Sequence, residues 1–252
     1  MRTNIYLFIL LIFPFTTLLG QSNTTVFDQA NAAYNGGNYS LAIEKYETIL
    51  NDKLHSAEVY FNLGNAHYRL GNVAESVYYF EQAKRLDPMD KTILNNSSFA
   101  NNMTQDAIDK LPETQIDLLQ QKVLAFLTLD QWTIITLVFA WMGALLFFMY
   151  RWNNHIRFKR LFFSLAIIFV LTTLVSLGLT QSKLALNSIQ KAVIFEREIE
   201  IWGEPNTRAD ILFLLHEGTV VEVVDALEGW SKVKLANGSE GWIQNSGIKH
   251  LN

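Results

Sequence analysis

Two long apolar runs stand out in the chain: WTIITLVFAWMGALLFFMY at residues 132–150 and LFFSLAIIFVLTTLVSLGLT at residues 161–180. Neither run contains a charged side chain, and each is about as long as a helix needs to be to cross a hydrocarbon core of roughly 30 Å. Their Leu, Ile, Phe and Val side chains favour insertion by roughly 3 to 8 kcal/mol per run. We therefore predict a hairpin of two membrane-spanning helices. The alternative is a helical hairpin buried inside a large soluble protein.

The segment between the two runs, residues 151–160, is basic and contains no acidic side chain. Lys and Arg close to the ends of spans keep a short loop on the cytoplasmic side of the membrane. The segments before and after the hairpin are then predicted to face outward. The residues that determine this topology are Arg151, Arg157, Lys159 and Arg160.

Residues 1–20 have the layout of a secretory signal peptide. A short positive region precedes an apolar core at residues 5–19, and small and polar residues follow it. An uncleaved anchor is the alternative. In both cases the chain that follows is exported, which agrees with the topology predicted from the basic loop.

Composition narrows the possible functions. Hydrophobic residues make up 50% of the chain and charged residues 17%, an excess that the hairpin explains. Acidic side chains outnumber basic ones in every segment predicted to lie outside the membrane apart from the loop, which argues against binding to nucleic acid. The chain has no cysteine, which excludes disulfides, Cys-ligated metals and thiol catalysis.

Residues 23–110 contain a repeat with a period of 34 residues. The paired positions are Ala30 and Gly64, Tyr34 and Tyr68, Gly37 and Gly71, Ala42 and Ser76, and Tyr46 and Phe80. Residues 57–90 resemble one complete tetratricopeptide repeat, a unit of two antiparallel helices. Two such units rarely bury a continuous core, so residues 91–110 are predicted to supply a third, capping helix.

One face of the first helix in each repeat is a candidate peptide groove, because extended peptides usually bind on this side in the tetratricopeptide family. Asn31 and Asn65 could hydrogen-bond a bound main chain, and Arg69 could bind a carboxylate. A plain assembly surface is the alternative. The candidate groove comprises Phe27, Asn31, Tyr34, Asn35, Phe61, Asn65, Tyr68 and Arg69.

Several element boundaries are predicted from capping patterns. Asn72 with Glu75 fits a capping box, Asp87-Pro88 is predicted to start the next helix, and Asp130 is predicted to cap the first span. Residues 111–131 form a connector, with an interfacial helix predicted at 117–129, and residues 181–190 form a linker.

Residues 191–252 change to an alternating pattern typical of strands. Asn237-Gly238 predicts a tight hairpin turn, and five or six short strands indicate a compact barrel. The segment resembles a bacterial SH3-like domain. In such domains Trp230 and Trp242 either fill the barrel or contact peptide or cell-wall ligands, and the sequence leaves both roles open. The predicted strands lie at 192–195, 198–202, 219–224, 230–235 and 240–243.

No catalytic constellation is evident. The five histidines are scattered, and the chain has no His-Glu-x-x-His metal pair, no Gly-x-Ser-x-Gly elbow and no phosphate-binding glycine loop. We therefore predict a protein that is not an enzyme and has no cofactor or metal. The predicted class is a multidomain membrane protein with an all-α tetratricopeptide repeat, a two-helix transmembrane hairpin and a small all-β SH3-like barrel.

The order of signal peptide, repeats, hairpin and barrel resembles the BatE family of the bacterial aerotolerance (Bat) operon. This resemblance implies an inner-membrane protein with periplasmic terminal modules. It also implies von Willebrand A-type Bat proteins as partners and a link to oxygen tolerance. Two functions follow: a scaffold for protein assembly, or an envelope sensor whose barrel binds peptidoglycan or peptide. The loop at 151–160 is too short to fold as an effector domain, which favours the scaffold.

Overall fold

The computed structural model describes residues 17–109, 111–112 and 114–251, with side chains described from Thr25 onward. Most of the signal peptide predicted at residues 1–20 lies outside these residues. The described chain separates into two compact units. One contains the residues up to Asp109 together with Lys191–Asn252, and the other contains Lys110–Gln190. The hairpin is therefore inserted, in sequence, between two segments of a single folded unit.

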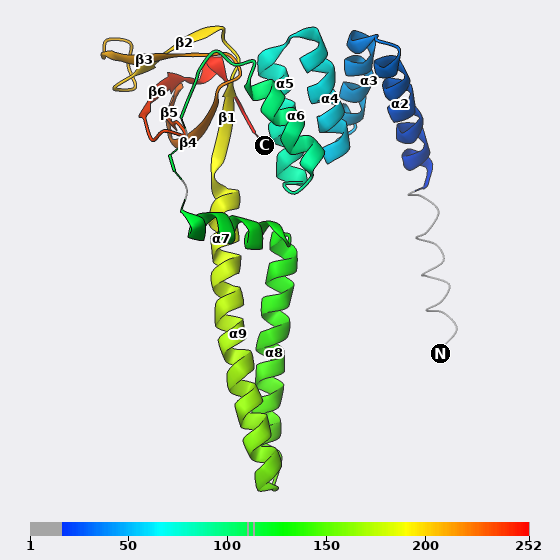
Figure 1. The fold of residues 1–252 in the computed structure, drawn as a ribbon, viewed down its shortest axis with the longest axis vertical. Coiled ribbons are helices and arrows are strands. Elements are labelled where there is room, and N and C mark those ends of the chain that lie inside the picture. Colours follow the sequence, from blue (N-terminus) through cyan, green and yellow to red (C-terminus); the bar gives the residue numbers. More distant parts are fainter. Residues whose placement is uncertain (1–16, 110, 113, 252) are drawn as a thin grey trace. The chain divides into compact units, whose positions relative to one another are not determined.

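The first unit begins with helices that pack side by side in chain order (Figure 1). Two antiparallel pairs correspond to the two predicted repeats, and a single helix follows them. These helices are α2 (Thr17–Asn35), α3 (Tyr39–Asn51), α4 (Ala57–Leu70), α5 (Val73–Leu86) and α6 (Lys91–Asn101).

Close approach between α4 and α5 depends on Gly64. A Cβ atom added there would lie 2.9 Å from the ring of Phe80, and the Gly64 carbonyl accepts a hydrogen bond from the Ser76 hydroxyl at 3.0 Å. Gly37 and Gly71 adopt φ values of 79° and 76° after the first helix of each pair. Glycine adopts this left-handed conformation without steric cost.

The helix starts differ from the predicted caps in three places. The side chain of Asn72 makes no capping bond and lies 3.1 Å from Nδ1 of His67 instead. The helix predicted to start at Asp87-Pro88 begins at Lys91, where Asp90 accepts bonds from two backbone N–H groups. The first span is capped by Thr128 in a capping box with Gln131, and Asp130 lies inside the first turn.

The barrel forms one antiparallel sheet in the order β3-β2-β6-β5-β4-β1-β7. Two of its strands, β3 and β7, were not predicted. Asn237 and Gly238 lie in the turn that joins β5 to β6, with Gly238 at φ 87°. This turn is longer than a two-residue hairpin turn, because Leu235 bonds to Ser239 and residues 236–238 lie between them. The strands are β1 (Gln190–Ile194), β2 (Glu198–Trp202), β3 (Ile211–His216), β4 (Val220–Leu227), β5 (Trp230–Lys234), β6 (Glu240–Gln244) and β7 (Ile248–His250).

Repeats and barrel share a buried core. Val193 of β1 packs in the same cluster as the repeat residues Val77 and Tyr78, while Ala192 and Ile194 on the other side of the strand pack inside the barrel. Ile108, from the segment after α6, packs against the barrel core. Helix α5 is buried along most of its length as a result.

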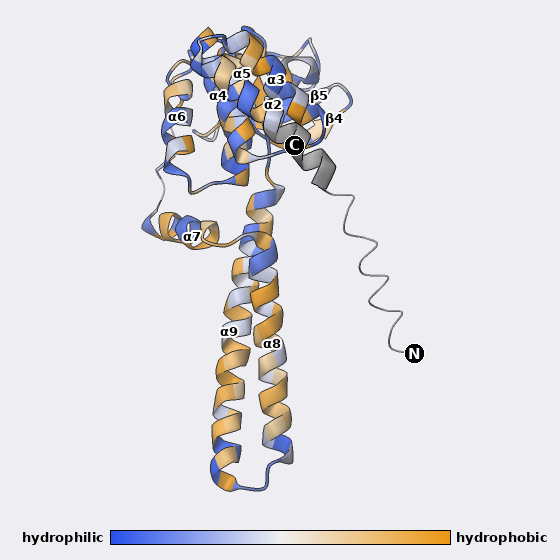
Figure 2. Cartoon of the chain, turned by 90° about the vertical axis from the view of Figure 1, so that its right-hand side faces the viewer, coloured by the Kyte–Doolittle hydropathy of each residue, from blue (hydrophilic) through white to orange (hydrophobic). Residues whose placement is uncertain are grey.

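The second unit contains α7 (Gln115–Ala125), α8 (Leu129–Trp152) and α9 (Ile156–Ser188). Helices α8 and α9 form an antiparallel hairpin whose residues are hydrophobic along most of its length (Figure 2). Both helices are long and apolar enough to cross a membrane, and only 6% and 11% of their most apolar windows are buried. The core helix of a soluble protein would be largely buried, so the exposed apolar surface favours a membrane hairpin over that alternative.

Polar contacts hold the two long helices together at the end away from their connection. The hydroxyl of Thr136 lies 2.7 Å from that of Ser176 and 3.2 Å from that of Thr180. Gly143 of α8 faces α9, where a Cβ atom added to it would be in ordinary van der Waals contact with Phe169 at 3.5 Å. Hydrogen bonds and small residues of this kind are typical of helix contacts in lipid.

Candidate functional site

The face predicted as a peptide groove lies on α2 and α4, with aromatic residues packed at its base. Phe27 and Phe61 occupy equivalent positions and contact Tyr46 and Phe80, with ring centroids 5.9 Å apart in each pair. Both phenylalanines are half-buried, so one side of each ring belongs to the repeat core.

Asn31 is engaged within the repeat. Its side-chain oxygen accepts hydrogen bonds from the Tyr46 hydroxyl and, at 3.2 Å, from the Asn62 amide. Burial raises the pKa of Tyr46 to about 12, so this hydroxyl stays protonated and donates at neutral pH. Asn31 therefore positions α2 against α3 and α4 within the repeat.

The exposed part of this face combines aromatic rings with one cation. The guanidinium of Arg69 lies 5.1 Å from the ring centre of Tyr39, and that ring packs edge-on against Tyr34 at 5.2 Å. Tyr68, Arg69 and Asn35 are exposed, while Tyr34 and Asn65 are half-buried. A cation over a ring keeps its outer N–H groups available for a carboxylate.

The face continues onto α6, which the sequence reading left out. The 34-residue step that leads from Asn31 to Asn65 leads on to Phe99, whose side chain is 57% exposed. The 34-residue period of the repeats therefore identifies Phe99 as the position equivalent to Asn31 and Asn65. We name the set Asn65, Tyr68, Arg69 and Phe99 the repeat surface.

A second candidate surface lies on the outer side of the barrel. In β5, Ser231 and Val233 are buried and point into the barrel. Trp230 directly precedes Ser231 in this strand, so its side chain points outward. Trp242 of β6 lies between buried Gly241 and Ile243 and also points outward. Neither indole belongs to the buried barrel core.

The structure adds a third tryptophan to this surface. Trp202 pairs with Trp242 across β2 and β6, and its ring lies 6.4 Å from that of Trp230 in an edge-on arrangement. The alternation of buried Ile199 and Ile201 already indicates that Trp202 faces outward. We name Trp202, Trp230 and Trp242 the tryptophan face.

Charged side chains border the tryptophan face. Lys232 lies opposite Trp242 in the sheet register and forms an ion pair with Glu240 at 2.8 Å. The bond from Lys232 holds the pKa of Glu240 below its ordinary value. Indole rings beside an ion pair can stack on an apolar ligand surface while polar groups bond its edge.

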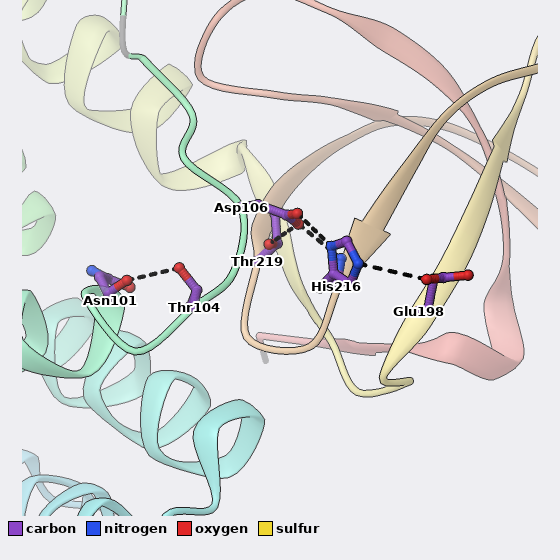
Figure 3. Close-up of polar contacts among 6 residues, drawn as sticks. All are labelled: Asn101, Thr104, Asp106, Glu198, His216 and Thr219. Atoms are coloured by element: carbon purple, nitrogen blue, oxygen red, sulfur yellow. Dashed lines mark hydrogen bonds and ion pairs between the residues drawn. The ribbon is translucent and has the colours of Figure 1, made fainter.

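A polar cluster joins the segment after α6 to the barrel (Figure 3). Asp106 accepts hydrogen bonds from the backbone N–H of His216 at 2.8 Å and the hydroxyl of Thr219 at 2.6 Å, and Nδ1 of His216 lies 2.6 Å from its other oxygen. On the far side of the imidazole, Nε2 lies 3.7 Å from Glu198. Burial acts to raise the pKa of Asp106, but the bonds from Thr219 and His216 outweigh it and hold this pKa below its ordinary value.

Two further contacts close the same junction. Gly218 has φ 84°, and a Cβ atom there would lie 2.8 Å from both Val73 and Thr104, so the barrel approaches the repeats closely at this turn. The ammonium of Lys249 lies 4.2 Å from the ring centre of Tyr78 and 5.5 Å from that of Phe195. The polar cluster therefore serves docking of the two modules.

Within the described residues, no group of three or more His, Asp or Glu side chains is arranged to hold a metal ion. The basic residues at 151–160 cluster at the connected end of the hairpin, where Arg151 lies in the last turn of α8 and the other three lie in the first turns of α9.

Comparison with known proteins identifies both modules. Residues 27–90 match the family model of the tetratricopeptide repeat, and residues 203–249 match that of the bacterial SH3 domain. The second match begins one residue after Trp202, so β1 and β2 belong to the barrel in the structure but lie outside the matched residues. No curated protein matches the chain. The chain thus combines a tetratricopeptide repeat with a bacterial SH3 domain, two kinds of module that serve protein interaction or peptidoglycan binding, around a pair of long apolar helices.

Proposed function

We propose that the chain is a membrane-anchored, non-enzymatic scaffold that assembles proteins on the periplasmic side of the bacterial inner membrane. The observation that carries this proposal is the single folded unit formed by repeats and barrel, which carries both the repeat surface and the tryptophan face and is divided in sequence by the hairpin segment. Three residues, Asn153 to His155, separate α8 from α9, which leaves no room for a folded domain on that side.

The proposed orientation rests on where the charges lie. The four basic side chains stand at the connected end of the hairpin, and the two chain segments of the folded unit join its other end. A positive connection favours the cytoplasmic side, so the modules face the periplasm.

The absence of cysteine makes this orientation directly measurable. Single cysteines are introduced by Asn154→Cys in the hairpin connection and by Asn237→Cys in the exposed barrel turn. In intact cells whose outer membrane has been permeabilised, a membrane-impermeant maleimide should label the barrel cysteine, and should label the connection only after lysis. The reverse pattern would contradict the periplasmic placement.

The partners that fit the resemblance are von Willebrand A-type Bat proteins, in a membrane complex linked to aerotolerance. The repeat surface supports this part of the proposal because aromatic side chains and Arg69 suit a segment that carries apolar residues and a carboxylate.

Partner recovery tests the assembly role. The full chain is purified in mild detergent, and co-purifying proteins are identified by mass spectrometry, for the native protein and for a variant with Tyr68→Ala, Arg69→Ala and Phe99→Ala. Met89→Ala, an exposed apolar residue in the connection after α5, is the control. Loss of membrane proteins with the triple variant alone supports the scaffold, and unchanged recovery with a folded repeat contradicts a role of this surface.

The tryptophan face supports a second function, an envelope sensor that binds peptidoglycan or peptide through the barrel. Sedimentation with purified cell-wall sacculi separates the two functions, since Trp202→Ala with Trp230→Ala should abolish co-sedimentation only if the barrel binds the wall. Persistent partner recovery with loss of sacculus binding would show that both surfaces act.

A further inference from the structure

Helix α7 has two apolar sides, and only one of them is covered. Leu124 is 1% exposed, and α7 packs against α9. Another side carries four apolar residues spaced three or four positions apart, which places them in one stripe. Their exposed fractions are 76% for Ile116, 64% for Leu119, 37% for Val123 and 80% for Phe126.

The helix is well formed despite this exposure. Thr114 caps it, accepting a bond from the backbone N–H of Asp117, whose carboxylate in turn accepts bonds from the N–H and hydroxyl of Thr114. The remaining sides carry Gln120, Gln121 and Lys122 together with one exposed leucine, Leu118. An ordered amphipathic helix with an uncovered apolar stripe requires an apolar environment on that side.

The position of α7 within its unit indicates what that environment is. The helix ends at Ala125 and α8 begins at Leu129, so α7 lies within a few residues of the point where the apolar run starts. It lies across the hairpin at the end away from the α8–α9 connection (Figures 1 and 2). The last charge before the uncharged run of α8 is Asp130, and the first after that of α9 is Lys183. Helix α7 is therefore level with the boundary of the apolar surface.

We propose that α7 lies in the plane of the outer membrane–water interface, with Ile116, Leu119, Val123 and Phe126 inserted among the lipid acyl chains. The occupant of the uncovered side is the lipid surface itself, because α7 leads within a few residues into α8, whose exposed side chains are mostly apolar as well. This inference rests on the proposed membrane-spanning hairpin. It gives α7 the role of fixing the height of the hairpin in the bilayer.

Site-directed spin labelling tests this placement in the full-length chain, which needs no removal of native thiols. Labels are attached to single cysteines at Ile116→Cys, Leu119→Cys and Val123→Cys, with Gln121→Cys on the opposite side of the same helix as the matched control. The protein is placed in nanodiscs of phosphatidylcholine and phosphatidylglycerol. Relaxation is measured with oxygen, which concentrates in the bilayer, and with a water-soluble nickel chelate.

We expect the ratio of oxygen to nickel accessibility to be several-fold higher at the three stripe positions than at Gln121→Cys. Equal, nickel-dominated accessibility at all four positions would place α7 in water and overturn the proposal. Low accessibility to both reagents at the stripe would show that a protein surface covers it, which would overturn the proposal as well.

A label at Leu137→Cys on the exposed apolar side of α8 distinguishes this inference from the hairpin on which it rests. Oxygen-dominated accessibility at Leu137 with water exposure of the α7 stripe would reject only the interfacial helix. Nickel-dominated accessibility at Leu137 would reject the membrane span itself. A circular dichroism spectrum matching that of the native chain confirms that each labelled variant is folded.

Discussion

His67 is a buried histidine of α4. Its ring stacks on Tyr79 with centroids 5.3 Å apart, and Nδ1 lies 3.1 Å from the amide of Asn72. The Nε2 atom is buried without a hydrogen-bond partner among the described residues. Burial lowers the pKa of His67, with a smaller lowering from Lys249 and an opposing effect of Glu75. His67 is therefore part of the packing between α4 and α5.

The repeat module should lose stability in mild acid because of this histidine. A pKa lower in the folded than in the unfolded state favours folding with the neutral ring; this contribution is complete above the unfolded value of about 6.5 and is lost as the pH falls toward the folded value. His67→Phe keeps the flat ring and cannot titrate. Melting curves between pH 8 and pH 5 should show a smaller acid-induced drop in melting temperature for the variant, and equal drops would mean that His67 is not responsible.

Asp106 should contribute to stability through hydrogen bonds, because three donor groups of the barrel converge on it. Asp106→Ala leaves these partners without their acceptor and should destabilise the folded unit by about 1–3 kcal/mol. Asp109→Ala, an exposed carboxylate three residues later, is the matched control. The measurement is thermal unfolding followed by tryptophan fluorescence, with limited proteolysis of residues 102–110. A stability equal to that of the control would show that the junction does not depend on Asp106.

The charge of Asp106 adds a second expectation. Since its pKa is lower in the folded state, its contribution is complete above the ordinary value of 3.8 and is lost as the pH falls toward the folded value. Asp106→Asn should therefore remove part of the acid sensitivity while keeping most of the hydrogen bonding.

At the scale of helices and strands, the sequence predicted which elements exist better than where they end. The 34-residue period and the charge-free runs are repeated signals, so the repeats and the hairpin helices were predicted correctly. Neighbouring polar side chains compete to accept hydrogen bonds from the same N–H groups, and this competition decides which residue caps a helix. Thr128 therefore caps α8 in place of Asp130, and Asp90 caps α6, which was predicted to start at Asp87-Pro88. Strand β3 lacks clear alternation in its run of Ile-Leu-Phe-Leu-Leu, and β7 has only three residues.

Strand β6 provides a direct test of which side of the sheet is the ligand surface. Trp242 and Ile243 are adjacent and point in opposite directions, and Ile243 is fully buried. Ile243→Ala should destabilise the barrel by about 2–5 kcal/mol, whereas Trp242→Ala should leave it folded with a much smaller loss. Denaturant unfolding followed by circular dichroism measures the free energy of unfolding of both variants. A loss of stability for Trp242→Ala as large as that for Ile243→Ala would mean that the indole of Trp242 is part of the barrel core.

At the scale of the whole molecule, the sequence predicted a row of separate modules, whereas the structure joins the first and last into one unit. Asp106 and His216 are 110 positions apart in the chain, and the residues that form the shared core have ordinary apolar character. A single sequence contains no periodic signal for such a contact. The sequence therefore predicts the repeat and the barrel individually, and the docking between them comes from the structure alone.

Shared packing predicts that the repeats depend on the barrel. A chain ending at Thr180 should leave Val77 and Tyr78 of α5 exposed, because the strands that cover them are missing. Hydrogen exchange measured by mass spectrometry should then show faster exchange along α5, while α2 and α3 change less. Unchanged protection of α5 in the truncated chain would mean that the repeats fold independently.

The insertion of the hairpin between the two halves of this unit sets the timing of its folding. Residues 191–252 leave the ribosome after α8 and α9, so the core around α5 cannot close until both apolar helices have been synthesised. At typical rates, the residues that follow α5 take roughly 10 to 30 s to make. During that interval Val77 and Tyr78 lack the barrel residues that pack against them in the finished unit.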